Sequence, residues 1–316
     1  MIEIFKTENG TLRQLDAVEP GCWVNVCAIT AEDAAWLSAN LDVSDDFLSA
    51  MSDRDEVSRA DKDVKRKQAL VIVDYPADDE KEELIDPEVA QFVTEPLSIL
   101  LIEDPGVIVT ASTAACGIIT KLRGDADVRI VTSKRTRFLL DVLYEVSKSY
   151  IEALRTLEKH TVNLERKLRK RQKNTGLMNM LSIEKSLLYM STSLKSCEPT
   201  LEAIQRGDFV DLFDGDKELF SLVIIEYKQA AEMCAIYTDV ITKAMDAFSS
   251  VINNNMNAAM SVLTTITLVL SIPTAVFSFY GMNTNLLPLA DSWIFPMLLS
   301  FALAAIATVL VLRFKR

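Results

Sequence analysis

The sequence predicts an α+β body that is followed by long helices and by two C-terminal transmembrane helices. Charge is distributed unevenly: the 66 residues from Ala247 to Leu312 contain one charged side chain, Asp291, whereas the first 246 residues contain 30 Lys or Arg and 44 Asp or Glu. Short apolar runs between turn residues fill the first 130 positions, as in mixed strands and helices. From about residue 134 onward, apolar residues recur every three or four positions, which indicates long helices.

Two segments near the C-terminus are long enough to cross a membrane. Met256–Phe279 contains 24 uncharged residues, about 36 Å as a helix, and Trp293–Leu312 contains 20, about 30 Å. A bilayer core is about 30 Å thick. The alternative for each segment is a buried core helix, but two such segments joined by a short loop favour membrane spans. Tyr280 and Trp293 lie at their ends, where interfacial aromatics are enriched.

The flanking charges predict the orientation of these spans. The tail at 313–316 contains three basic residues, and the 280–292 loop contains none. The positive-inside rule places the tail and the large body in the cytoplasm and the loop outside. We therefore expect a multi-pass protein of the plasma (inner) membrane. The expected parts are an α/β domain (1–132), a long-helix stalk (133–255), a first span (256–279), an outer loop (280–292), a second span (293–312) and a tail (313–316).

Within the body, strands are expected at Met1–Phe5, Cys22–Ala28, Ala69–Asp74, Ser98–Glu103 and Val107–Thr110. A helix is expected at Ala31–Asn40, and longer ones at Lys134 to about Lys173, about Leu177 to Gln205, and Asp216 through Ile252 into the membrane. Gly176 is expected to terminate the first long helix. No Pro or Gly lies between Asp216 and Pro273, so a single rod is allowed there.

Composition argues against several classes of function. The net charge of −12 disfavours nucleic-acid binding, which needs positive charge. The single histidine, His160, leaves little room for histidine catalysis or a multi-histidine metal site. The five cysteines form no CxxC pair and are typical of reduced thiols. Because no nucleotide loop, nucleophile–base pair or zinc spacing occurs, we expect no enzyme.

A polar stripe runs along the first span in alternating steps of four and three residues. It comprises Asn253, Asn257, Met260, Thr264, Thr267, Ser271, Thr274, Ser278 and Gly281. Such residues can hold membrane helices together, or several copies of the helix can surround a water-filled pore. An unbroken polar seam favours the pore, and two helices per chain then require a homo-oligomer.

The predicted lining is neutral, with no carboxylate to strip water from an ion and no His or Cys to hold a soft metal. Neutral oxygens suit a hard cation that keeps its water, and Mg²⁺ dehydrates reluctantly. An inside-negative membrane potential would drive its entry with about 4.6 kcal/mol per 100 mV for a divalent ion.

The span ends in Tyr280-Gly281-Met282-Asn283 and is followed by a second span and a basic tail. This arrangement resembles the CorA family of magnesium transporters, whose signature is Gly-Met-Asn at the outer end of the first span. The resemblance implies a funnel-shaped homopentamer that conducts hydrated Mg²⁺ passively. Asn283 would line the outer mouth and hold the hydrated ion, Gly281 would allow a tight turn, and Met282 would pack behind. The other pore positions of the family fall on Asn257, Met260, Leu263 and Thr274, with Leu263 as a hydrophobic constriction.

The chain departs from the family pattern in three places. Ser271 and Ser278 replace an apolar Met and a Gly, and no acid follows the motif before Asp291. The regulatory acid of the family falls near Leu222, with Glu226 the nearest acid on its C-terminal side. Other candidates for a regulatory Mg²⁺ site are Asp78, Asp79 and Glu80, in the acidic run after Pro76. The alternative for this run is a solvated loop. The basic 166–173 segment is either a solvated helix tip or a contact for anionic headgroups.

Two alternative functions stay open. A relative that carries Zn²⁺, Co²⁺ or Ni²⁺, with or without proton coupling, would share the same architecture. A non-conducting, membrane-anchored scaffold would use the polar stripe for assembly alone.

Overall fold

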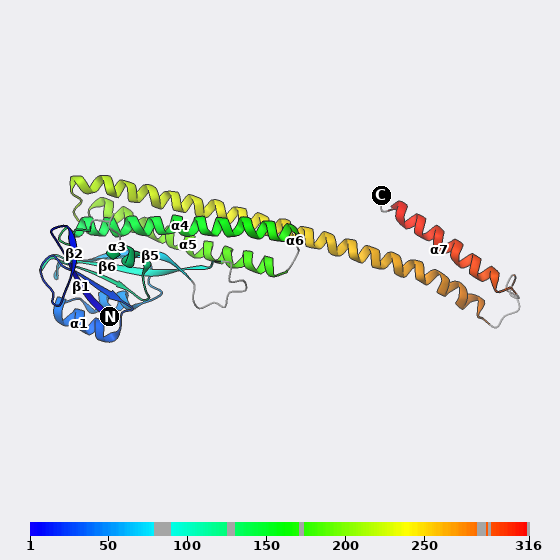
Figure 1. Cartoon of the computed structure of the whole chain (residues 1–316), viewed down its shortest axis with the longest axis horizontal. Coiled ribbons are helices and arrows are strands. Elements are labelled where there is room, and N and C mark those ends of the chain that lie inside the picture. Colours follow the sequence, from blue (N-terminus) through cyan, green and yellow to red (C-terminus); the bar gives the residue numbers. More distant parts are fainter. Residues whose placement is uncertain (79–89, 125–129, 171–173, 283–288, 290–291, 315–316) are drawn as a thin grey trace. The chain divides into compact units, whose positions relative to one another are not determined.

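The computed structural model describes residues 1–78, 90–124, 130–170, 174–282, 289 and 292–314 (Figure 1). The chain forms two compact units, Met1–Met245 and Asp246–Arg316. Helix α6 (Asp214–Tyr280) contributes residues to both units.

The first unit is built on a seven-stranded sheet with the strand order β2-β1-β3-β7-β6-β5-β4. Strands β3 and β7 run parallel, and all other neighbours are antiparallel. Gln68 of β5 lies opposite Ile102 of β6, and Asp78 lies opposite Phe92. The strands are β1 (Ile2–Glu8), β2 (Thr11–Leu15), β3 (Trp23–Cys27), β4 (Arg59–Asp63), β5 (Gln68–Asp78), β6 (Phe92–Ile102) and β7 (Val107–Ser112).

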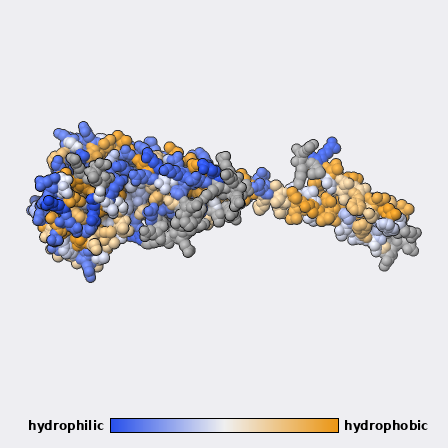
Figure 2. Space-filling model, in the orientation of Figure 1, coloured by the Kyte–Doolittle hydropathy of each residue, from blue (hydrophilic) through white to orange (hydrophobic). Residues whose placement is uncertain are grey.

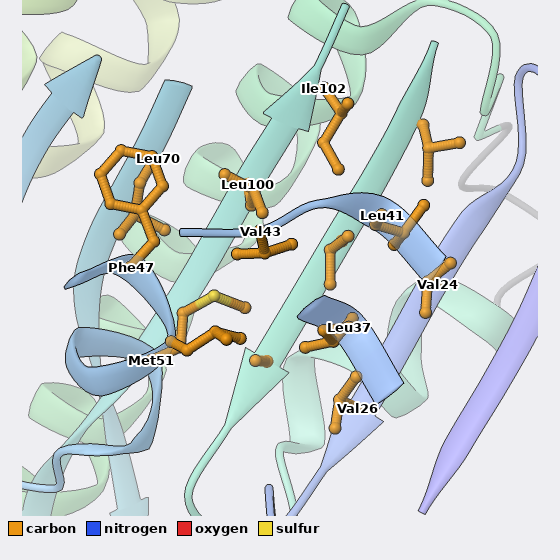
Figure 3. Packing of buried hydrophobic residues seen from close by; sticks show 14 of the residues in the cluster. Val24, Val26, Leu37, Leu41, Val43, Phe47, Met51, Leu70, Leu100 and Ile102 are labelled. Atoms are coloured by element: carbon orange, nitrogen blue, oxygen red, sulfur yellow. The ribbon is translucent and has the colours of Figure 1, made fainter. Parts of the chain in front are cut away.

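Helices α1 (Ala31–Leu41) and α2 (Asp45–Ser52) cover one face of this sheet. Because strand side chains alternate between faces, Val24 and Leu100 point to the same side and pack against Leu37 and Met51 (Figure 3). Thr30 starts α1 with a capping box, and Ser44 caps α2. Such caps contribute about 1 kcal/mol each.

Helices α4 (Arg135–Lys170) and α5 (Asn174–Arg206) lie along the other face (Figure 1). The short helix α3 (Gly117–Gly124) precedes α4. Trp23 of β3 is fully buried, and its ring centroid lies 5.1 Å from that of Phe138 on α4. Its Nε1 donates a hydrogen bond of 2.7 Å to Thr110 Oγ1. Two helical layers therefore enclose the sheet.

Polar contacts join α4, α5 and the part of α6 in this unit to one another and to the sheet. Ser193 on α5 donates a 2.7 Å hydrogen bond to the Asp74 carboxylate, and the Tyr150 hydroxyl on α4 lies 2.6 Å from Ser193 Oγ. On α6, Cys234 donates to the Leu187 carbonyl of α5. Burial raises the pKa of Asp74, and the Ser193 hydrogen bond opposes that rise.

The second unit contains the remainder of α6 and helix α7 (Ile294–Phe314). Both α6 and the segment Ile294–Val311 are long and apolar enough to cross a membrane. Hydrophobic residues cover much of the surface of this unit that Figure 2 shows.

The structure confirms the α+β body with long helices and all five expected strands. The strands β2 and β4 and the helices α2 and α3 were not predicted. The expected helix end at Gly176 was wrong, because α5 begins at Asn174 and includes this glycine in its first turn.

Candidate ion pathway on helix α6

The polar stripe predicted from the sequence is exposed along the membrane segment of α6. Each of Asn253, Asn257, Met260, Thr264, Thr267, Ser271, Thr274 and Ser278 is exposed in the single chain. Leu263, one residue away from the stripe, is 60% exposed. The second unit therefore leaves the stripe free to face water or other subunits.

The opposite face of α6 is partly covered. The half-buried residues are Ser261, Thr265, Val269, Ile272, Pro273, Val276 and Tyr280. At the end of this face, the ring of Tyr280 lies 6.1 Å from that of Phe295 on α7. At 3.6 residues per turn, the centre of this face lies about 150° from the centre of the stripe. The stripe is therefore not the surface by which α6 contacts α7.

The hydroxyl hydrogens of the stripe point to the backbone. Thr264 donates to the Met260 carbonyl at 2.8 Å, and Thr267 donates to the Leu263 carbonyl at 2.9 Å. Ser271 and Thr274 donate to the Leu268 and Leu270 carbonyls. A hydroxyl has a single hydrogen and two lone pairs. Its free side is therefore an acceptor, which suits the water hydrogens of a hydrated cation.

Pro273 lies inside α6, one residue before Thr274. Proline has no backbone N–H, so the carbonyl four residues earlier loses its usual helical donor. This position allows a bend next to the stripe.

A side chain at Gly281 would fit tightly at the outer end of α6. The Gly281 amide donates 2.8 Å to the Phe277 carbonyl, and a Cβ on Gly281 would lie 3.2 Å from that oxygen. Met282 follows with 57% of its surface exposed. Asn283, the expected selectivity residue, lies outside the described residues.

The structure describes only some of the candidate regulatory acids. Glu226 is half-buried on α6, and Asp78 is the last residue of β5. Asp79 and Glu80 lie outside the described residues. Among the residues that the structure describes, no group of three or more His, Cys, Asp or Glu side chains could hold a metal ion. Leu222, where the family has an acid, is 49% exposed.

The chain thus combines an α+β body and long helices with two helices that are long and apolar enough to cross a membrane. The sequence model described as CorA-like Mg²⁺ transporter protein matches residues 19–316. The chain belongs to this family.

Relatives and solved structures agree with this assignment. The chain is 27% identical over 271 residues to the cobalt/magnesium transport protein CorA of Methanocaldococcus jannaschii, covering 85% of this chain and 82% of that protein. The complete structure of the CorA magnesium transporter from the same organism matches with a TM-score of 0.78 and 24% identity, over 99% of this chain and 96% of that chain. The full-length CmaX protein matches with a TM-score of 0.73 at 13% identity, over the same shares. These structural matches show the fold.

Proposed function

We propose that the chain is one subunit of a homopentameric, channel-like transporter that moves hydrated Mg²⁺ passively, with Co²⁺ and Ni²⁺ as further candidate ions. The observation that carries the proposal is the face of exposed acceptor oxygens on α6, opposite the face covered in the second unit. The printed name of the M. jannaschii relative, a cobalt/magnesium transport protein, supports the choice of ions.

Each part of the pathway has its own role in this proposal. Asn283 holds the hydrated ion at the outer mouth, with Gly281 and Met282 shaping the turn. Below it, the hydroxyls of Ser278, Thr274, Ser271, Thr267 and Thr264 contact the water shell of the ion, and Asn257 accepts it at the inner end. Met260 and Leu263 form an apolar constriction that can close by dewetting.

The proposed location is the plasma (inner) membrane, with both termini in the cytoplasm. The basic tail and the absence of Lys and Arg from the outer loop support this orientation. An inside-negative potential then drives Mg²⁺ inward without a coupled ion. Besides being cargo, Mg²⁺ is a candidate regulator at Glu226 or in the acidic run from Asp78.

The deciding experiment is Mg²⁺ uptake into proteoliposomes under an imposed inside-negative potential, with Zn²⁺ and Co²⁺ as competitors. Saturable uptake that increases with potential supports the proposal, and Asn283→Ala should abolish it. Proton-linked Zn²⁺ movement without Mg²⁺ entry would instead assign the chain to zinc transport. Intact oligomers that pass no ion would assign it to a scaffold.

Two further measurements test the pore itself. Water-soluble thiol reagents should label Thr267→Cys and Thr274→Cys above the background of the unsubstituted protein, and Val269→Cys on the covered face should stay unlabelled. Native mass spectrometry of the purified protein should give a mass of five chains. A monomer or dimer in that measurement contradicts the pentamer.

A further inference from the structure

An aromatic contact joins the end of α6 to the start of α7. Tyr280 is the last residue of α6, and Phe295 lies in the first turn of α7. Their ring centroids are 6.1 Å apart, and the ring planes meet at 63°. This is the edge-to-face geometry that aromatic pairs prefer. Both residues are half-buried and belong to the second unit.

Rigid neighbours flank this contact on both helices. The Phe279 ring lies 6.0 Å from that of Tyr280, at an interplanar angle of 75°. Beside Phe295, Pro296 is buried and has a fixed φ in the first turn of α7. An aromatic side chain has only two rotatable bonds. A contact between two such rings therefore fixes the helix ends more closely than a contact between flexible aliphatic chains.

The remainder of the buried face of α7 consists of small residues. Among the described residues of α7, those buried besides Pro296 are Ser300 and Ala304. Residues of this size let two membrane helices approach closely, but they reach little beyond the helix surface. The Ser300 hydroxyl donates to the Met297 carbonyl of α7 itself. This face therefore offers α6 a close but smooth contact, and the ring of Phe295 is what engages its outer end.

The position of Tyr280 determines where the outer turn begins. The Gly281 amide donates to the Phe277 carbonyl at 2.8 Å, and the Met282 amide donates to the Phe279 carbonyl at 3.4 Å. These hydrogen bonds tie the turn to the last turn of α6, so a tilt or rotation of the helix end moves both residues. Tyr280 lies on the covered face, opposite the stripe. Its ring therefore acts on the turn and not on an ion in the pathway.

We propose that Phe295 is a positioning residue for cation entry: through Tyr280, its ring fixes the outer end of α6 and with it the turn at Gly281 and Met282. The effect on transport rests on the proposed function. A site that holds an ion through its water shell depends on distance, because hydrogen bonds weaken steeply outside a narrow range of geometry. Displacing the turn in every subunit should therefore weaken Mg²⁺ binding at the mouth and leave the conducting stripe unchanged.

The test compares two phenylalanines of α7. Phe295→Leu removes the ring contact and keeps an apolar side chain. Phe301→Leu makes the same change at a residue that is 63% exposed in the single chain, so it is the matched control. Phe295→Tyr keeps the ring and is the rescue variant. Full-length proteins in proteoliposomes are assayed for initial Mg²⁺ uptake over a series of concentrations, after size-exclusion profiles establish that the oligomers are intact.

The expected result is a split between KM and maximal rate. Phe295→Leu should raise the KM for Mg²⁺ about fivefold, the value of one aromatic contact, with the maximal rate within about twofold. Phe301→Leu and Phe295→Tyr should behave like the unchanged protein. Tyr280→Leu added to Phe295→Leu should cause no further loss, because both remove the same contact. The proposal is overturned if Phe295→Leu matches Phe301→Leu, or if it lowers the maximal rate at an unchanged KM.

A second readout does not depend on transport. A nitroxide spin label on Met282→Cys reports the mobility of the outer turn by electron paramagnetic resonance, after subtraction of the signal from the native cysteines. Phe295→Leu should make this label more mobile, and Phe301→Leu should not. If the unsubstituted protein takes up no Mg²⁺, the proposed function fails, and the spin label alone decides whether Phe295 positions the turn. An unchanged spectrum in Phe295→Leu overturns the proposal even where uptake falls.

Discussion

Two threonines on opposite faces of α6 offer a matched test of the ion pathway. Thr265 and Thr267 are two residues apart, about 200° around the helix. Their hydroxyls donate to the Ser261 and Leu263 carbonyls at 2.7 and 2.9 Å. Thr267 is exposed on the stripe, and Thr265 is half-buried on the covered face. Replacing either with valine keeps the shape of the side chain and removes the same oxygen.

The two substitutions should differ in their effect on transport. In a pore, Thr267→Val removes one acceptor oxygen from every subunit at the same level. Each lost hydrogen bond to the water shell of the ion costs about 0.5–1 kcal/mol. Five copies together raise the barrier by about 3 kcal/mol, which corresponds to about a hundredfold slower flux. Thr265→Val removes no oxygen from the pathway and should leave flux within about twofold.

The assay is initial-rate Mg²⁺ uptake into proteoliposomes at equal protein density and a fixed inside-negative potential. Size-exclusion profiles of both variants establish that the oligomer is intact. Equal loss of flux in both variants, or a loss in Thr265→Val alone, would refute the assignment of the stripe as the conducting face.

Three other perturbations follow from the structure. Gly281→Ala places a Cβ 3.2 Å from the Phe277 carbonyl, so the outer turn must give by a few tenths of an ångström. Mg²⁺ uptake should fall about tenfold, and unchanged uptake would show that this turn tolerates a side chain. Ser193→Ala removes a donor from the half-buried Asp74 carboxylate and should lower the free energy of unfolding by about 1–3 kcal/mol, measured as a lower thermal midpoint. Burial raises the pKa of Asp141 to about 6 from 3.8, so stability should fall as pH rises from about 4 to 6, because the folded chain holds a proton there that the unfolded chain releases. Between pH 4.5 and 7.5 this contribution is about 2 kcal/mol, and thermal midpoints at these two pH values should show that Asp141→Asn lacks it; parallel pH profiles would refute it.

The parts of the fold that could be predicted from the sequence are those in which the spacing of apolar residues repeats over many turns. The helices α4, α5 and α6 repeat their apolar spacing over many turns, and their bounds were predicted within a few residues. Strands β2 and β4 are short, polar edge strands, TLRQL and RADKD, without an apolar alternation. Their pairing with β1 and β5 depends on tertiary contacts, which local patterns do not encode.

The same distinction applies to the candidate sites. The stripe is periodic, so its residues could be predicted as one face, but the covered face with Thr265 needed the structure. The direction of each hydroxyl hydrogen also required the structure, because the hydroxyl of serine or threonine can donate its hydrogen bond to the helix backbone or to a group outside the helix.

Because the hydroxyl hydrogens of the stripe point to the backbone, the stripe presents acceptor oxygens. Its composition alone does not establish this. A hydroxyl lining that was free to rotate could serve anions and cations alike. On α6, the backbone carbonyls take the hydrogens of Thr264, Thr267 and Thr274, so the free surface of each oxygen is electron-rich. In a segment without a charged side chain, this arrangement attracts the water hydrogens around a cation while leaving its hydration shell in place. Met260 and Leu263 add two exposed apolar side chains at the inner end of the stripe. The oxygens favour an ion that keeps its water shell, and a ring of apolar side chains excludes that water. Conduction and closure in the proposed pore therefore act on the same hydrated ion.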